Sequence, residues 1–184
     1  LAACSFAALS VGIVVLFAHA QTFPAIVVGN DGCINASLHG VRPWIDSTAG
    51  LQRLTGVDLP KDATIQIGPG SYRLTATVDA RTGVKNDFHV DHLWLRGAGA
   101  VPGSLGTVIR GNVAGPLVAY NAAGLDAAAS VRIDGIAFIN DHPQGIGLQL
   151  ERGDSCTISN CVFGPRHRGL VIGSKLATNV EVSI

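Results

Sequence analysis

The chain has 184 residues, with 13 acidic and 13 basic side chains, so its formal net charge is zero. This length suits one domain rather than two, and the charge balance lacks the basic excess that nucleic-acid binding requires. Hydrophobic residues make up 47% of the chain and charged residues only 14%, which is too apolar for a disordered protein. Because aromatic residues are scarce and the chain holds 23 glycines, we expect a core of small and β-branched side chains with glycine turns.

The first thirty residues carry no Asp, Glu, Lys or Arg. Residues 6–18 are nearly all apolar, and Ala18-His19-Ala20 places small residues at the two positions that a signal peptidase reads. We interpret residues 1–20 as a secretory signal peptide, which predicts a secreted protein (extracellular or periplasmic) with no membrane segment in the mature chain. A membrane anchor is the alternative, since a run of about 18 residues can span a bilayer. A lipoprotein box ending at Cys4 is a third interpretation, but it would stand at the start of the apolar run instead of its end.

Residues 21–62 are expected to form an entry segment with a short helix. Ser47 can cap a helix that runs from Thr48 to about Leu54, and Leu51 and Leu54 share one face of it. Such a face suits the first coil of a repeat protein, whose hydrophobic end must be covered.

Residues 63–184 contain a repeat of about 24 residues. Apolar residues coincide when 130–138 is set beneath 155–163, at an offset of 25, and a third copy begins at Asn179. A second predicted strand repeats in phase, since 145–150 matches 169–173 at an offset of 24. Further strands are predicted at 63–67, 92–96, 107–109 and 117–120, with alternate side chains pointing inward.

Two architectures fit short strands at this spacing: antiparallel hairpins, or a parallel solenoid whose laps stack about 4.8 Å apart. Phe138 and Phe163 occupy the same place in two copies, which favours the solenoid because equivalent side chains then stack in the interior. Asp134-Gly135 and Ser159-Asn160 are residue types that accept the left-handed backbone of a tight bend. The fold class predicted is therefore all-β.

The units at 131–138 and 156–163, each a strand, a short turn and a strand, resemble the right-handed parallel β-helix of the pectin-lyase-like superfamily. Residues 39–52 resemble the entry segment of its secreted members, and 67–72 resemble their first coil. The resemblance covers about residues 37–184 and implies a right-handed parallel β-helix solenoid with a short N-terminal capping helix. Because Ile184 falls inside a predicted strand, we expect the solenoid to be truncated at its C-terminus.

The resemblance implies a pectate lyase or polygalacturonase type of secreted protein, acting on or binding an acidic polysaccharide as a lyase or glycosidase. Residues 167–174 resemble a polygalacturonase stretch, but Arg168 stands where that family has Gly, and the paired Asp motif is missing. The polygalacturonase activity therefore does not carry over. The alternative function is a non-catalytic secreted solenoid for glycan binding or surface display.

In the resembling enzymes, substrate lies across the outer face of the strand typified here by 145–150, beside the loops that precede it. The outward positions are expected in two columns, Val118 with Gly147 and Val171, then Tyr120 with Gln149 and Gly173. These columns carry no carboxylate, whereas acid–base hydrolysis needs two and calcium-assisted elimination needs several oxygen ligands. No catalytic residue is assigned.

The loops before these strands are the better candidates for substrate binding. An Arg and His group suits uronate carboxylates, and an Asp or His could act as a general base. The alternative is that they are solvated loop residues, or a weak Asp141–Arg166 surface pair. The candidates for substrate contact are Asp141, His142, Arg166, His167, Arg168, Gln149 and Tyr120.

No cofactor or metal is predicted. Asp91-His92 lacks a third ligand, and Gly97-Ala98-Gly99 lacks the third glycine and the helix of a nucleotide loop. Three cysteines remain after the signal peptide, so at least one thiol is unpaired within the monomer. We expect Cys156 and Cys161 to be small buried hydrophobes.

Overall fold

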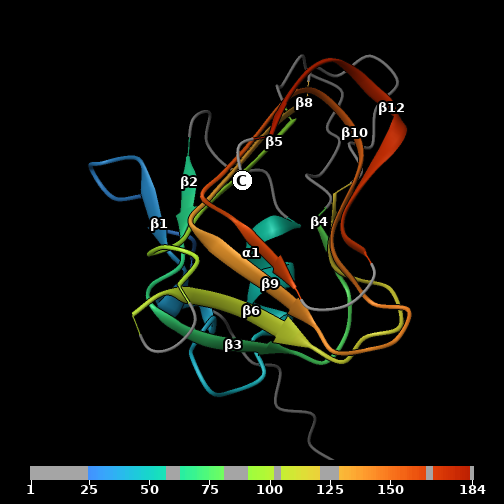
Figure 1. The fold of residues 1–184 in the computed structure, drawn as a ribbon. Helices are drawn as coiled ribbons and strands as arrows, with labels where there is room; N and C mark the ends of the chain where they lie inside the picture. Colours follow the sequence, from blue (N-terminus) through green and yellow to red (C-terminus); the bar gives the residue numbers. More distant parts are fainter. Residues whose placement is uncertain are drawn as a thin grey trace, which may run out of the picture.

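The computed structural model describes residues 25–56, 63–80, 91–101, 105–120, 129–164 and 168–182. In these ranges the chain is mainly β, and its strands form three parallel sheets (Figure 1). The predicted signal peptide lies outside the described residues. No helix in the described part of the chain is long and apolar enough to cross a membrane.

The three sheets are built from strands far apart in the sequence. The first contains β1 (Cys33–Asn35), β2 (Thr64–Gln66), β5 (Asp91–Arg96), β8 (Ala129–Asp134) and the second halves of β10 (Ile146–Ser159) and β12 (Arg168–Val182). The second contains β3 (Gly70–Leu74), β6 (Thr107–Gly111), β9 (Ile136–Asn140) and β11 (Val162–Gly164). The third contains β4 (Val78–Ala80), β7 (Pro116–Tyr120) and the first halves of β10 and β12.

Every strand pair in the described residues is parallel, which excludes the antiparallel alternative for them. The chain visits the sheets in a fixed order: β2, β3 and β4 are followed by β5, β6 and β7, and then by β8, β9 and β10. This arrangement is compatible with a parallel β-helix.

The register of the predicted repeat is confirmed for the strand at 130–138 and 155–163. For the second strand the predicted offset of 24 is wrong, because Leu148 pairs with Leu170 and Gln149 with Val171, at an offset of 22. Val131 pairs with Cys156, which pairs with Val180, so the offsets of 25 and 24 are those of neighbouring strands. Phe138 pairs with Phe163, and their rings stack with centroids 5.5 Å apart. The two predicted bends have left-handed backbone, with φ of 67° at Gly135 and 50° at Asn160.

The sheets enclose a core of aliphatic side chains. One interior row runs across four neighbouring strands of the first sheet, and each of its members is at most 1% exposed: Ile65, Leu95, Ile133 and Ile158. Burying a side chain of this size stabilises the fold by about 1.5–3 kcal/mol. Cys156 and Cys161 lie in the same core, as predicted, and the three described cysteines are free thiols.

The helix predicted after Ser47 is present as α1 (Thr48–Thr55), after a short 3-10 helix η1 (Ala36–His39), but Ser47 does not cap it. The buried Ser47 hydroxyl donates to the Arg42 carbonyl (2.8 Å) and accepts from the Arg42 N–H (3.1 Å). Asp46 takes over the capping, since its carboxylate accepts from the Thr48 N–H at 2.9 Å. The apolar face of α1 is buried in one cluster with the first predicted strand: Leu51, Leu54, Ile65 and Ile67.

Candidate functional site

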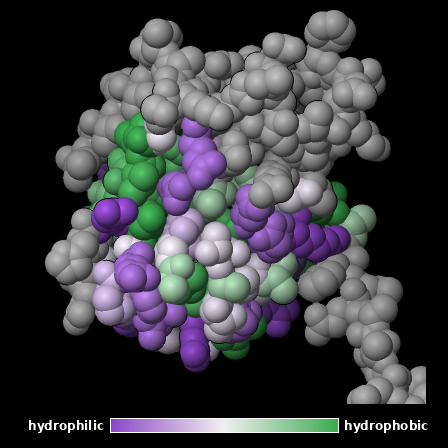
Figure 2. Space-filling view, turned by 90° about the vertical axis from the view of Figure 1, so that its right-hand side faces the viewer, coloured by the Kyte–Doolittle hydropathy of each residue, from purple (hydrophilic) through white to green (hydrophobic). Residues whose placement is uncertain are grey.

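The outer strip of the third sheet is where the sequence places the groove. Gln149 of β10 pairs with Ala119 of β7 and Val171 of β12, and its side chain is half-buried on this face. Hydrophilic and hydrophobic side chains alternate on this side of the molecule (Figure 2).

The expected orientation of Tyr120 is wrong. Tyr120 pairs with Leu150, and both side chains point into the core with 0% exposure. Val118, expected to face outward, pairs with Leu148 and is buried as well. The sequence offers no full repeat before β7 to fix its phase, and a shift of one residue turns each side chain to the other face of a sheet.

The loop that borders this strip is held by Asn140, the last residue of β9. Asn140 is 3% exposed, and its amide accepts from the Val113 N–H (3.1 Å) and the His142 N–H (3.3 Å). The same amide donates to the carbonyls of Val113 (3.0 Å), Gly115 (2.8 Å) and Ile146 (3.1 Å). These bonds fix the loop 141–145 against the loop between β6 and β7.

Inside this loop, the side chain of His142 has a structural contact. Its Nδ1 accepts from the Gln144 N–H at 3.1 Å. The His142 carbonyl accepts from the Gly145 N–H at 2.8 Å, which closes the turn. A Cβ at Gly145 would overlap the side chain of Asn140, so the turn requires glycine at this position.

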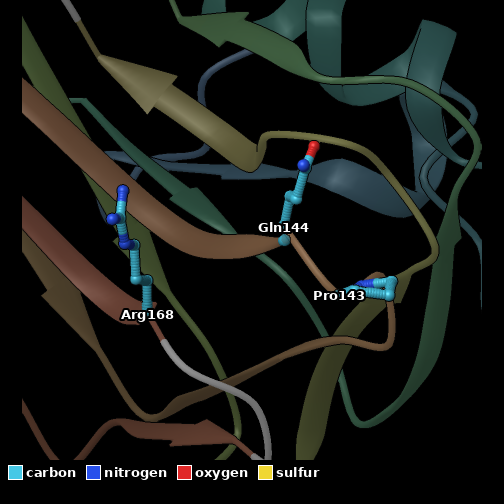
Figure 3. Close-up of a pocket in the computed structure, with 4 residues that line it drawn as sticks. Pro143, Gln144 and Arg168 are labelled. Carbon is cyan, nitrogen blue, oxygen red and sulfur yellow. The ribbon is translucent and has the colours of Figure 1, made fainter.

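A groove of about 400 Å³ opens between this loop and β12, lined by Pro143, Gln144, Gly145 and Arg168. Arg168 is exposed at the start of β12 and pairs with Ile146 of β10. In Figure 3 the side chains of Arg168 and Gln144 extend to the same side of the backbone, and Pro143 lies beyond Gln144. Arg168 forms no ion pair with another described residue.

The strip also carries a carboxylate that the sequence prediction missed. Gln149 donates to the carboxylate of the exposed Glu151 at 2.7 Å. The prediction ended this strand at Leu150, but β10 continues to Ser159 with a register shift between Leu150 and Arg152. The expectation of a strip without carboxylates is therefore wrong. Glu151 stands two residues after Gln149, and this spacing, which places two side chains on one face of a strand, was the available signal.

Asp141 does not join Arg168. Its carboxylate accepts from the Arg110 guanidinium at 3.1 Å, in an exposed ion pair with the second sheet. Arg166 and His167 lie outside the described residues. The groove therefore brings together Arg168 and Gln144. Gln149 lies outside the groove on the same sheet, and Asp141 faces a different surface.

The groove offers donors and one cation, which can bind carboxylate and hydroxyl groups. Within the described ranges, no three His, Cys, Asp or Glu side chains gather closely enough to hold a metal ion. The chain was compared with protein-family models, with curated proteins and with solved structures, and none of them matches it.

Proposed function

We propose that the chain is a secreted right-handed parallel β-helix of the pectin-lyase-like type, with α1 as its N-terminal cap, that binds an acidic polysaccharide. The three parallel sheets and their fixed order along the chain support the fold. The exposed Arg168 guanidinium in the groove, without an acidic partner among the described residues, carries the proposed function.

A uronate carboxylate fits Arg168, because a guanidinium can donate two parallel hydrogen bonds to it. The amides of Gln144 and Gln149 then form hydrogen bonds with the hydroxyl groups of neighbouring sugars. One exposed ion pair contributes only about 0.2–1 kcal/mol. Useful affinity therefore comes from a polymer that engages several sites at once.

Binding is better supported than catalysis. Asp79 stands in the same row as Ala119 and Gln149, and Glu151 is bonded to Gln149, but neither carboxylate lines the groove beside Arg168. Asp141 is paired with Arg110 on another surface. Hydrolysis of a glycosidic bond uses two carboxyl groups that flank the bond. A lyase or glycosidase acting on the same polymer is the second candidate, and the Glu151 carboxylate beside the strip is the observation in its favour.

The test measures binding of polygalacturonate to the purified full chain by titration calorimetry. Arg168→Ala should weaken binding about 1.5-fold to fivefold, and Arg168→Lys should restore part of it. Added salt should weaken binding of the wild type. Arg42→Ala is the matched control, because this exposed arginine lies on a loop beside α1.

No binding of polygalacturonate, or equal affinity of Arg168→Ala and the wild type, would refute the proposal. The same samples are assayed for new reducing ends and for unsaturated uronate. Product that disappears in Glu151→Gln would favour the catalytic candidate.

A further inference from the structure

Beside the second sheet, Trp44 has an unusual conformation at the edge of a depression. Its φ is 69° and its side chain is 75% exposed. A bulky residue in left-handed backbone is strained, and exposure leaves the indole without the burial that normally stabilises it. Neither local conformation nor packing explains a tryptophan at this position.

The surrounding backbone holds Trp44 in place. Its N–H donates to the Ser71 carbonyl of β3 at 2.8 Å. Pro43 packs against Gly70, where an added Cβ would lie 2.6 Å from the proline ring. Asp46 bridges to Arg73 in parallel register. Trp44 and Asp46 are thus tied to β3, one by a backbone hydrogen bond and the other by an isolated parallel bridge.

Trp44 forms the edge of a depression of about 450 Å³ on the outer face of this sheet. Arg73 of β3 and Arg110 of β6 line it as directly paired neighbours, and Asp141 lies at its far side. Three strand spacings of about 4.8 Å separate Asp46, bridged to Arg73 of β3, from β9, which is about 14 Å. The depression is separate from the groove beside Arg168.

The charges in and beside this depression balance. The Arg110 guanidinium is paired with Asp141 at 3.1 Å. Asp46, beside Arg73, accepts from the Thr48 hydroxyl (2.6 Å) and the Thr75 hydroxyl (2.7 Å). The hydrogen bond from the Thr48 side chain is the main cause that lowers the pKa of Asp46, so it is ionised at neutral pH. Two arginines therefore face two carboxylates.

We propose that this depression binds neutral glycosyl units of an oligosaccharide. The apolar face of a sugar ring stacks on the Trp44 indole. Its hydroxyls accept from Arg73 and Arg110 and donate to Asp141, because a hydroxyl is both donor and acceptor. An anionic ligand would face the two carboxylates, and a cationic one would face the two arginines. Surface ion pairs are weak, so the Arg110–Asp141 pair can exchange partners at little cost.

The test uses the intrinsic fluorescence of the protein. The chain has two tryptophans, and Trp94 stacks under Arg132 on the first sheet. A Trp94→Phe background therefore leaves Trp44 as the only indole. The full chain is titrated separately with cellohexaose, xylohexaose and mannohexaose, each to about 10 mM, which detects a Kd in the millimolar range.

At least one neutral hexasaccharide should shift the Trp44 emission with a saturable curve. By calorimetry on the otherwise native chain, Trp44→Asn should weaken that binding at least about tenfold, and Trp44→Phe should weaken it less. Arg168→Ala, in the other groove, should leave it unchanged. Trp44→Asn should also raise the melting temperature, because asparagine accepts left-handed backbone. If Trp44 had only a structural role, Trp44→Asn would lower the melting temperature instead.

The absence of any saturable shift with the three neutral probes would overturn the proposal. Binding of hexagalacturonate that depends on Trp44, without binding of the neutral probes, would overturn it too. The second result would leave this face as an anion site. Loss of polygalacturonate binding in Arg168→Ala concerns only the groove of the third sheet, so the two proposals fail independently.

Discussion

Replacing Asn140 by Ala removes the side chain that joins the loop after β9 to the loop after β6. The carbonyls of Val113 and Gly115 keep other partners, since they also accept from the Gly115 N–H (2.8 Å) and the Ile146 N–H (2.9 Å). The N–H groups of Val113 and His142 lose the partner that Asn140 provides. An unsatisfied amide costs about 1–3 kcal/mol. Both sites are half-buried, so we expect the free energy of unfolding to fall by about 2–4 kcal/mol.

The change is measured by urea unfolding of the full chain, followed by circular dichroism. Asn112→Ala is the matched control, because Asn112 is exposed in the same loop and should change stability by less than about 0.5 kcal/mol. The melting temperature of Asn140→Ala should fall by about 5–15 °C. A loss below about 0.5 kcal/mol in Asn140→Ala would show that this network is not what holds the loop.

Three further outcomes follow from buried groups. Thr107→Val should lower the free energy of unfolding by about 1–3 kcal/mol, because the buried Thr107 hydroxyl accepts from the Ala98 N–H at 2.8 Å. Equal urea midpoints for the variant and the wild type would contradict this. Burial, and secondarily Arg53, lower the pKa of His39. As the pH falls, the unfolded chain therefore takes up a proton on this histidine before the folded chain does, and the free energy of unfolding should fall below pH 6.5. This fall should be smaller in His39→Gln. Burial raises the pKa of Cys156 from 9.0 to about 11. The unfolded thiol ionises first, so stability should decline by about 2–3 kcal/mol between pH 9 and pH 11, with a smaller decline in Cys156→Ala.

The strands at 130–138 and 155–163 could be predicted from the sequence because their interior rows repeat at a fixed offset. Neighbouring parallel strands place like side chains beside one another, so Phe138 meets Phe163 and Val131 meets Cys156. The helix after Ser47 was also predictable, from its apolar spacing. Both features could be predicted because the apolar spacing of the helix and the offset of the repeat are visible in the sequence.

The candidate site was predictable only in part. The sequence placed Arg168 and the loop 141–145 beside one another, and the groove between them confirms that placement. It could not give the phase of β7, because an insertion precedes this strand and a shift of one residue exchanges inside and outside. Tyr120 was therefore placed on the wrong face.

The partner of Asp141 and the exposure of Trp44 were decided by tertiary structure alone. Asp141 lies 31 residues from Arg110 in the chain, and no local pattern reports that pairing. Trp44 is exposed because its N–H is bonded to Ser71 on the neighbouring strand, where the preceding Pro43 packs against Gly70. Hydrophobic periodicity specifies which residues enter a core. The side chains that meet on the outer faces depend instead on the register of neighbouring strands and on the positions of the loops between them.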